Sequence, residues 1–438
     1  MVKRITKNKL TYWAFFLSIA LLALLCFRYY RIGIPTNEVI LFALFFLFSI
    51  SILFISFKFY NSVINPISIY VPFLVLLSYS FIQLSNLQVG YSIKSILVIL
   101  FSVISYILSS MSKISLKRGS KRKFLSKKSR RFLLFLLTLG ALLTFLLESR
   151  RLGYIPILHL TNKNVYSDMN ENVIPLIHYF ITLLAFLPAW IYILYKQSIV
   201  TRRESNILIL IILFILLNYL SRQILLLLIL CSFGAYMFYN KINKKVIFRF
   251  IGALAVIFIL ITIIRFQTIE TSVPIAEYYR IVAGIDNPKV SFTEAFLVEY
   301  STKRFVAFNN VINYADNIKF LGLGQYTLKP IMSLLFLDNL GFTSNVPELN
   351  TENLVTTYMA DPYLDFRIIG VILINALYGL LSITFYKKIK RGEEDGIVGF
   401  WIITFCLIMG VFINFFNTML IWLGLIFNRL LINPSNDG

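Results

Sequence analysis

The sequence has little charge, few cysteines and almost no histidine. Of its 438 residues, 14% are charged and 58% are hydrophobic, whereas a soluble domain carries about a quarter charged residues. All three cysteines lie inside apolar runs, which excludes a disulfide framework and a cysteine-based metal site. Two histidines leave little from which to build a histidine-ligated metal site or a catalytic triad. These scarcities exclude most soluble enzymes and disulfide-rich secreted proteins.

The formal net charge of +22 does not indicate a nucleic-acid partner. A basic nucleic-acid binder gathers its cations on a polar surface, whereas the cations here flank long apolar runs. The glycine patterns of nucleotide-binding loops are missing too, because Gly322, Gly324 and Gly341 do not follow strand signals. We therefore expect no nucleic-acid partner and no cofactor.

What the sequence does contain is a series of apolar runs long enough to cross a bilayer. A spanning helix needs about 20 mostly apolar residues, with about 17 to 25 as the usual range. The sequence thus predicts an all-α, polytopic membrane protein, a single integral membrane domain over 1–438 with about 12 transmembrane helices. The predicted spans are 11–27, 39–57, 66–84, 95–111, 132–147, 173–195, 207–220, 224–238, 250–264, 368–385, 397–415 and 419–431.

Clusters of lysine and arginine set the predicted orientation, because short loops rich in these residues are poorly translocated. Such clusters precede the first span and recur at 113–131, 196–203, 241–249 and 387–391. All of them fall on one side, so both termini are predicted to be cytoplasmic. The segment 112–131 is then a basic cytoplasmic loop.

Three segments on the opposite side are candidates for function: an outer loop at 148–172, a hairpin tip at 221–223, and a large outer loop at 265–367 between helices 9 and 10. Structureless loops beyond about 15 residues are uncommon, so the large loop predicts a small extracytoplasmic subdomain. An amphipathic helix within it is predicted by apolar residues at helical spacing, namely Phe305, Phe308, Ile312 and Ala315.

Arg222 is the clearest single candidate, since an ionisable residue at membrane depth is a functional hypothesis by default. The two predicted spans beside it hold only about 14 and 15 residues, or roughly 21 to 22 Å. The hairpin tip would then lie below the outer surface, where Arg222 needs a water-filled cavity or an anionic partner. The alternative is that Arg222 reaches outward to lipid phosphate.

Other arginines on the predicted outer side are candidates for a diphosphate site, because guanidinium groups bind phosphate oxygens bidentately. They are Arg150 and Arg151 at a helix end, Arg265 at the mouth of the ninth span, and Arg280 after two tyrosines. For each of them, surface anchoring or an ion pair is an equally good interpretation.

The large loop contains no histidine, so a carboxylate is its ordinary candidate for a general base. The segment 350–365 combines Asn, Thr, Tyr and Asp just before a predicted span, a composition suited to hydrogen-bonding sugar hydroxyls. The alternative interpretation is a solvated cap on that span, with Asp361 and Pro362 forming an ordinary turn.

At this point the sequence resembles the family of O-antigen and capsular polysaccharide repeat-unit polymerases. The resemblance rests on the Gly-Tyr-Ile-Pro-Ile-Leu run at 153–158, the Ser221–Arg222 pair between two hydrophobic helices, and the large late loop. As topology it covers nearly the whole chain. The loop carries the remaining motif residues, which are Tyr278, Tyr279, Arg280, Asn353, Thr356, Thr357, Tyr358, Tyr363, Asp365, Phe366 and Gly370. Arg367 departs from the small residue that the family often has there, so it is either an additional phosphate contact or an anchor.

The resemblance implies a glycosyltransferase that joins oligosaccharide repeat units carried on undecaprenyl diphosphate, at the outer face of the bacterial cytoplasmic membrane. Because arginines can neutralise the diphosphate leaving group, no metal is required. The implied diphosphate-binding residues are Arg222, Arg280, Arg265, Arg150 and Arg151. The implied catalytic residues are Asp361 and Asp365, and the implied glycan contacts are Asn353, Thr357, Tyr358 and Tyr279. Implied partners besides the lipid-linked oligosaccharide are the bilayer, a flippase and a chain-length regulator.

Two other functions compete with this one. An O-antigen ligase resembles the polymerases in topology but relies on a histidine in the late loop, which this chain lacks. A lipid-linked oligosaccharide flippase or secondary transporter would bind its substrate near the midplane between paired repeats. The large loop and the absence of paired halves argue against a transporter.

Overall fold

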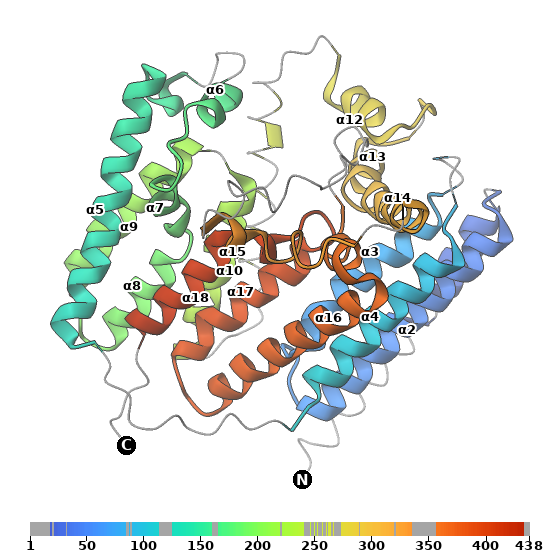
Figure 1. The fold of residues 1–438 in the computed structure, drawn as a ribbon, viewed down its shortest axis with the longest axis horizontal. Coiled ribbons are helices and arrows are strands. Elements are labelled where there is room, and N and C mark those ends of the chain that lie inside the picture. The colour runs from blue at the N-terminus through green and yellow to red at the C-terminus, as the bar shows by residue number, and fades with distance from the viewer. Residues whose placement is uncertain are drawn as a thin grey trace. The chain divides into compact units, whose positions relative to one another are not determined.

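The computed structural model describes residues 18–19, 22–31, 33–84, 87, 90–113, 125–159, 165–219, 221–240, 246, 249, 252, 256, 260, 262–263, 266, 273–288, 290–318, 321–334 and 356–432 (Figure 1). Within these ranges the chain is all-helical. Contacts divide it into two compact units, each built from stretches that are far apart in the sequence. The first unit comprises Met1–Lys113, Val273–Ile383 and Cys406–Thr418, and the second comprises Ile114–Ser272, Thr384–Phe405 and Met419–Gly438.

The first unit combines helices from the amino-terminal quarter of the chain with helices from its later half. They are α2 (Thr36–Tyr60), the 3₁₀ turn η1 (Ser68–Tyr70), α3 (Val71–Phe81), α4 (Ile93–Ser110), α12 (Ile275–Ala283), α13 (Phe292–Leu297), the π-helical turn η4 (Val298–Thr302), α14 (Lys303–Ile318), α15 (Lys329–Leu334), the part of α16 (Ala360–Lys390) up to Ile383, and the 3₁₀ turn η6 (Phe415–Asn417). α2 packs along α3, and α14 packs against α4.

Aromatic rings form the core of the first unit. Tyr70 stacks on Tyr106 with ring centroids 4.4 Å apart, and its hydroxyl lies 2.8 Å from that of Tyr358. Phe73 packs edge-on against both Phe305 and Tyr358. All five rings are at most 1% exposed, so helices α3, α4 and α14 meet around the segment that precedes α16.

The predicted amphipathic helix of the large loop is confirmed as α14. Its four apolar positions, Phe305, Phe308, Ile312 and Ala315, are completely buried. The polar residues Asn310 and Asn313 on its other faces are exposed. Helical periodicity was therefore sufficient to find this element and the face that it buries.

The second unit contains α5 (Lys127–Leu152), η3 (Pro156–His159), α6 (Val165–Glu171), α7 (His178–Leu183), α8 (Leu187–Lys196), α9 (Arg202–Tyr219), α10 (Arg222–Tyr239), the first part of α17 (Asp395–Met409) and α18 (Met419–Leu431). α8 packs against both α9 and α10, and α5 packs against α7 and α9. Trp190 is completely buried in this unit, where its ring N–H donates to Asn428 Oδ1 at 3.1 Å.

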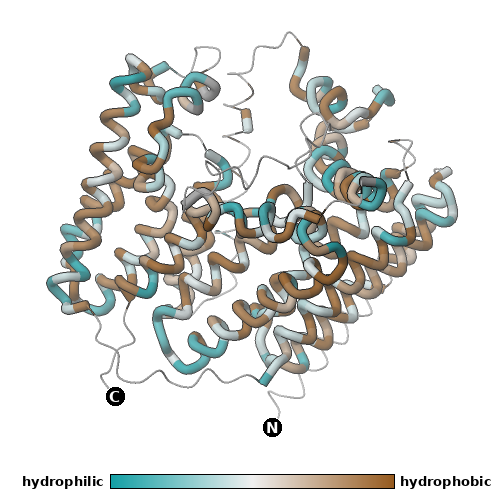
Figure 2. The backbone as a smooth tube through the Cα atoms, in the orientation of Figure 1, coloured by the Kyte–Doolittle hydropathy of each residue, from teal (hydrophilic) through white to brown (hydrophobic). Residues whose placement is uncertain are grey.

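Five helices of the described chain are long and apolar enough to cross a membrane: Thr36–Tyr60, Ile93–Ser110, Lys127–His159, Arg222–Tyr239 and Ala360–Lys390. Figure 2 shows apolar residues along the lengths of α5 and α16 and polar residues at their ends. In α5, the side chains of Phe132, Leu139, Leu143 and Leu146 are each more than half exposed. Such apolar outer faces are compatible with a membrane protein. The count of about 12 spans stays a prediction.

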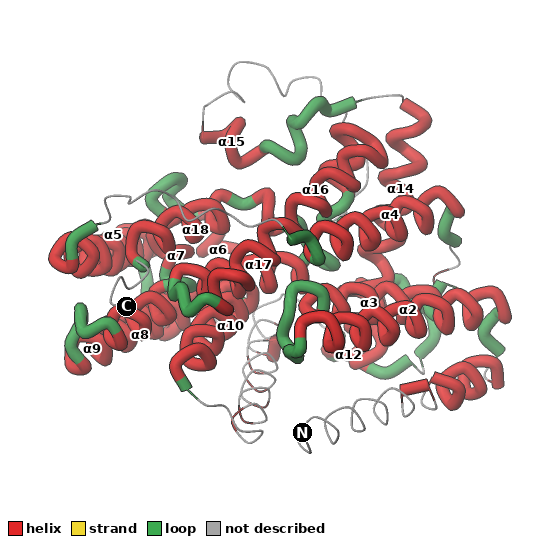
Figure 3. The backbone as a smooth tube through the Cα atoms, turned by 90° about the horizontal axis from the view of Figure 1, so that it is seen from below, coloured by secondary structure: helices red, strands yellow, loops and turns green. Residues whose placement is uncertain are grey.

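Several predicted boundaries need correction. The span at 173–195 is wrong as a single helix, because a turn at 175–177 precedes α7 and a turn at 184–186 separates α7 from α8 (Figure 3). Pro188 lies in the first turn of α8, where its missing N–H costs no hydrogen bond. The outer loop at 148–172 starts too early, since α5 continues to Leu152. The span at 250–264 lies almost entirely outside the described residues.

The helices beside Arg222 are longer than predicted. α9 and α10 each have 18 residues, which corresponds to about 27 Å. The sequence-based length was too short because the search for apolar residues excluded the charged start of α9 at Arg202. The argument that short helices draw Arg222 below the membrane surface is therefore wrong.

α16 contains a break that matches the predicted start of a span at residue 368. Phe366 and Arg367 have non-helical backbone angles, and Arg367 has a φ of 56°. The short helical segment 360–365 is thus distinct from the long apolar segment that follows it. Asp361 and Asp365 lie on the short segment, one turn apart.

A test of the packing of the second unit is the substitution Gly234→Ala. A Cβ at Gly234 of α10 would lie 1.9 Å from Cδ1 of Trp401 in α17, so the indole would have to move. We expect a loss of about 1–3 kcal/mol in stability, measured as a lower thermal unfolding temperature in detergent. The control is Gly252→Ala, because a Cβ on this helical residue meets no described atom within 4 Å. Equal melting temperatures for the two variants would contradict this packing.

Candidate functional site

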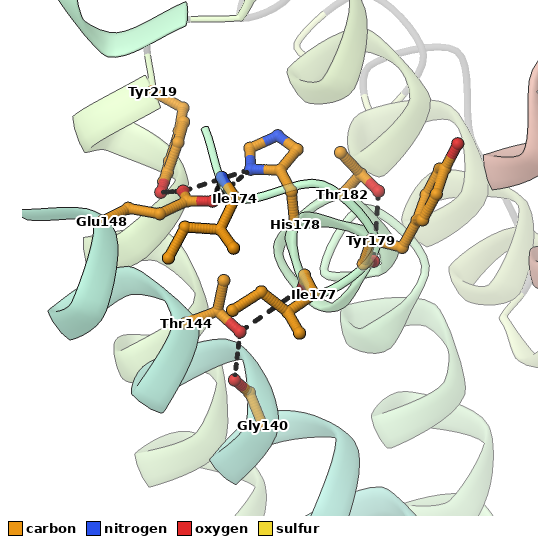
Figure 4. A network of polar contacts seen from close by, with 9 residues as sticks. All are labelled: Gly140, Thr144, Glu148, Ile174, Ile177, His178, Tyr179, Thr182 and Tyr219. Atoms are coloured by element: carbon orange, nitrogen blue, oxygen red, sulfur yellow. Dashed lines mark hydrogen bonds and ion pairs between the residues drawn. The ribbon is translucent and has the colours of Figure 1, made fainter. Parts of the chain in front are cut away.

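A buried carboxylate organises one end of the second unit. Glu148, in the last turns of α5, is 5% exposed and accepts three kinds of hydrogen bond (Figure 4). Its Oε1 lies 3.0 Å from the backbone nitrogen of Ile174, and both of its oxygens lie 3.1 Å from Nδ1 of His178. The hydroxyl of Tyr219 donates to Oε2. The residues come from α5, the start of α7 and the end of α9, so this Glu148 network joins three helices.

Local sequence explains how these groups meet. α5 ends at Gly153, which has a φ of 85° and whose N–H donates to Ser149. The chain then returns through η3 and α6, and the turn at Pro175 delivers Ile174 and His178 to the carboxylate. A buried ionised carboxylate is costly unless it is paired and hydrogen-bonded, and here two neutral donors and one imidazole meet that cost.

The orientation of the His178 ring follows from its partner. An ionised carboxylate only accepts hydrogen bonds, so the proton between the two groups lies on Nδ1 of His178. The other ring nitrogen, Nε2, points away from Glu148 in Figure 4. The side chain is 22% exposed, and the ring of Tyr219 packs edge-on against it at 5.5 Å.

A small pocket with room for about one water molecule adjoins this network. It is lined by Phe145, Glu148, Ser149, Leu152, Pro156, Met169, Asn172 and Tyr219. Four of these eight side chains are apolar, and Glu148, Ser149, Asn172 and Tyr219 contribute polar groups.

Three of the five predicted diphosphate-binding arginines lie at helix ends of the second unit. Arg150 and Arg151 follow Glu148 in the last turn of α5 and are exposed. Arg222 begins α10, three residues after Tyr219, and its Nη1 donates to Thr262 Oγ1 at 3.3 Å. The Glu148–Tyr219 hydrogen bond joins the end of α5, which carries Arg150 and Arg151, to the end of α9, which precedes Arg222 in the chain.

The other two arginines are placed differently. Arg280 lies in α12 of the first unit, where its Nε is buried without a hydrogen-bond partner among the described residues. Arg265 is outside the described residues. Arg150, Arg151 and Arg222 therefore belong to the second unit, and Arg280 belongs to the first.

A second polar cluster surrounds Asp361 in the first unit. Its Oδ2 accepts hydrogen bonds from the side-chain amides of Asn414 at 2.7 Å and Asn417 at 2.9 Å. Asn417 also donates to the backbone carbonyl of Tyr326. Within the described chain, Asp361 has no ion-pair partner and its Oδ1 has no hydrogen-bond partner. This oxygen can accept a proton or a hydrogen bond from a ligand.

Asp365, one turn further along, has a different environment. It is completely buried, and its two oxygens accept the backbone N–H groups of Tyr326 at 3.2 Å and Thr327 at 2.6 Å. A Cβ at Gly322 would lie 2.4 Å from Asp365 Oδ1, so only glycine fits there. Asp365 therefore holds the turn at 323–328, and its predicted catalytic role stays a prediction.

Tyr326, which this turn positions, is a hydrogen-bond donor at neutral pH. Burial, followed by the negative charge of Asp365, raises the pKa of its phenol to about 12. The hydroxyl consequently keeps its proton over the whole physiological range. This phenol lies beside the cluster of Asp361 and the two asparagines, and it adds a neutral hydroxyl donor there.

The predicted glycan contacts lie in packed surroundings. Tyr279 belongs to an apolar cluster with Phe292 and Phe296, and it is 7% exposed. Tyr358 is completely buried, and its hydroxyl donates to Asn375. Thr357 is 1% exposed, and Asn353 lies outside the described residues. The structure gives the three described side chains packing roles, and their contacts with a glycan stay predictions.

Arg367 acts as an anchor between two helices of the first unit. Its guanidinium donates to the backbone carbonyl of Ala315 in α14 and lies 5.7 Å from the centre of the Tyr363 ring. The hydroxyl of Tyr363 in turn donates to Asp316 at 3.1 Å. Of the two interpretations of this residue, its contacts support the anchor.

Sequence reasoning missed the partners of both carboxylates. The sequence predicted no role for Glu148, and two histidines left little from which to build a metal site or a catalytic triad. A usable signal existed, because His178 is an ionisable residue within a predicted apolar span. Asn414 and Asn417 likewise interrupt an apolar run at the turn before the last span. Tyr219, one of many tyrosines, carried no such signal.

Comparisons of the chain with protein-family models, with curated proteins and with solved structures find no match. The fold defines the class coarsely, as an all-helical protein with apolar helices compatible with a membrane. The groups that could take part in a reaction are those of the polar clusters around Glu148 and Asp361.

The role of Asp365 can be tested with Asp365→Asn. The new amide nitrogen would face one of the two backbone N–H groups that the carboxylate now accepts, leaving a buried donor unpaired. We expect a loss of about 1–3 kcal/mol, seen as a lower unfolding temperature and faster proteolysis at the turn 323–328. Asp286→Asn, at an exposed position of the same unit, is the control and is expected to melt like the unaltered protein. An unchanged stability of Asp365→Asn would remove its anchoring role.

Proposed function

We propose that this chain is an integral membrane glycosyltransferase of the polysaccharide polymerase type. It joins oligosaccharide repeat units carried on undecaprenyl diphosphate into an O-antigen or capsular polysaccharide, at the outer face of the bacterial cytoplasmic membrane. The topology that goes with this proposal has about 12 transmembrane helices, both termini in the cytoplasm and the large outer loop at 265–367. The lipid bilayer, a flippase and a chain-length regulator are its proposed partners.

The observation that carries the proposal is the position of Arg150, Arg151 and Arg222 next to the Glu148 network along the chain: two lie in the last turn of α5 after Glu148, and Arg222 begins α10 three residues after Tyr219. Arg222 also opens α10, where the first backbone N–H groups of the helix add partial positive charge. Three guanidinium groups and a helix start offer the donors that a diphosphate needs. These residues lie at the ends of α5 and α9 away from the basic starts of both helices, which is the predicted outer side.

The chemistry follows from the leaving group. The oxygen of an acceptor hydroxyl forms a bond to the anomeric carbon of the donor sugar, and the bond from that carbon to the diphosphate oxygen breaks. The bonding electron pair leaves with the diphosphate, whose growing negative charge the arginines stabilise most in the transition state. The hydroxyl proton passes to a base, and the products are a longer lipid-linked glycan and undecaprenyl diphosphate.

The competing functions differ in what they would need. A ligase would transfer the finished glycan to a lipid core and would look to a histidine in the loop at 265–367, which has none. A flippase or transporter would need a site near the middle of its spans, whereas Arg150, Arg151 and Arg222 all lie at helix ends. The helix-end position therefore favours a reaction at the membrane surface.

The decisive assay supplies purified protein in detergent or nanodiscs with a lipid-diphosphate-linked repeat unit alone. We expect glycans of two or more repeat units and release of the free lipid diphosphate. In a parallel reaction that also contains a lipid core, transfer only onto that core would instead indicate a ligase. Movement of the lipid-linked unit across vesicles, without any longer glycan, would replace the proposal with a transporter.

Arg222→Ala is expected to lower chain extension by about 10²–10³-fold, the effect of removing one donor that stabilises transition-state charge. Arg222→Lys is expected to recover only part of it, because lysine lacks the bidentate fork. Product length is read on gels after a fixed time.

Two control variants separate chemistry from structure. Thr262→Val removes the hydroxyl that Arg222 contacts, and Arg203→Ala removes an exposed cation at the opposite end of α9. Both are expected to retain most of the activity. If Arg222→Ala extends chains as fast as Arg203→Ala does, Arg222 has no part in binding the diphosphate.

A further inference from the structure

We propose that His178, held by Glu148, is the general base that takes the proton of the acceptor hydroxyl. This inference rests on the proposed function and adds a catalytic residue to it. The sequence had pointed instead to Asp361 and Asp365 in the first unit. His178 lies in the second unit, bonded to the Glu148 carboxylate that also accepts the hydroxyl of Tyr219.

The geometry prepares one nitrogen of His178 for this role. Glu148 accepts a hydrogen bond from Nδ1, and that contact leaves the lone pair of the neutral ring on Nε2. Nε2 points away from the carboxylate in Figure 4, and it has no hydrogen-bond partner within the described chain. A carboxylate that fixes the tautomer and direction of an imidazole is the arrangement by which histidine bases are oriented in hydrolases and transferases.

The pairing is more than a way to satisfy a buried carboxylate. Glu148 already receives the backbone N–H of Ile174 and the hydroxyl of Tyr219, one for each oxygen. These two donors also fix the carboxylate in place, so that the imidazole meets a rigid acceptor. The ring of the second histidine, His159, lies tilted against that of Tyr154 with centroids 4.8 Å apart, and it makes no ion pair within the described residues. His178 therefore differs from it in having an orienting partner.

The neighbouring residues fit a base that works beside a diphosphate. Along the chain, Arg150 and Arg151 follow the carboxylate that orients His178, and Arg222 follows the tyrosine that packs against its ring. In the step, Nε2 takes the hydroxyl proton as the oxygen bonds to the anomeric carbon, and the diphosphate leaves with the electron pair. The resulting imidazolium is stabilised by Glu148 until it loses its proton to water.

The test is His178→Asn in the full-length protein with the lipid-diphosphate-linked repeat unit. The asparagine amide nitrogen takes the place of Nδ1 and keeps the hydrogen bond to Glu148, but no atom replaces Nε2. We expect kcat to fall about 10²–10⁴-fold, the range for removal of a general base. We expect KM and the affinity for the lipid diphosphate to stay within about threefold, because the arginines remain. His159→Asn is the matched control and is expected to keep full activity.

Chemical rescue gives a readout that a purely structural role would not change. His178→Ala removes the ring, and added imidazole can then supply a base from solution. We expect imidazole to restore part of the rate in proportion to its concentration, with no effect on the unaltered protein. This second variant also covers the case in which His178→Asn folds poorly.

The outcomes separate this inference from the function on which it rests. If the unaltered protein does not lengthen the glycan, the proposed function fails. If it does, and His178→Asn keeps a kcat within about threefold of it while Arg222→Ala is inactive, the function stands and His178 is not the base. Loss of activity in Asp361→Asn together with an active His178→Asn would give the role to Asp361. A failure of imidazole to rescue His178→Ala would also overturn the inference.

Discussion

Polar groups placed among apolar helices must find their partners within the protein, and this constraint governs most of the structure. Several hydroxyl side chains inside helices bond to the carbonyl one turn earlier, as Ser49 does to Phe45 and Thr138 does to Leu134. Asn375 does the same with Val371 while receiving the hydroxyl of Tyr358. Such local pairs let polar residues occupy apolar helices without leaving a hydrogen-bonding group unpaired away from water.

Carboxylates cannot be satisfied in this way, because they only accept hydrogen bonds and the carbonyls of their own helix do not donate any. Glu148 and Asp361 therefore reach across to other segments. Glu148 draws in the start of α7 and the end of α9, and Asp361 draws in the turn that contains Asn414 and Asn417. The same requirement that fixes these tertiary contacts also concentrates reactive groups at two places.

The sequence was sufficient for elements but not for these contacts. The last span was predicted at 419–431, the bounds of α18, and the buried face of α14 followed from its periodicity. The break between α7 and α8 was missed because apolar composition alone does not reveal the turn between them. Glu148 lies 71 residues from Tyr219, and Asp361 lies 56 from Asn417. Separations of this size depend on how helices pack, which no local pattern encodes.

The interleaved composition of the two units has a consequence for how the chain is made. The helices α2, α3 and α4 emerge early from the ribosome, yet their unit also requires residues up to Thr418. The second unit begins with α5 and ends with the final helix, so it too closes only at the end of synthesis. Neither unit can fold as a contiguous fragment. The early helices must therefore be stabilised by lipid, by chaperones or by one another until the last tenth of this sequence has been made. A truncation there disables both units at once.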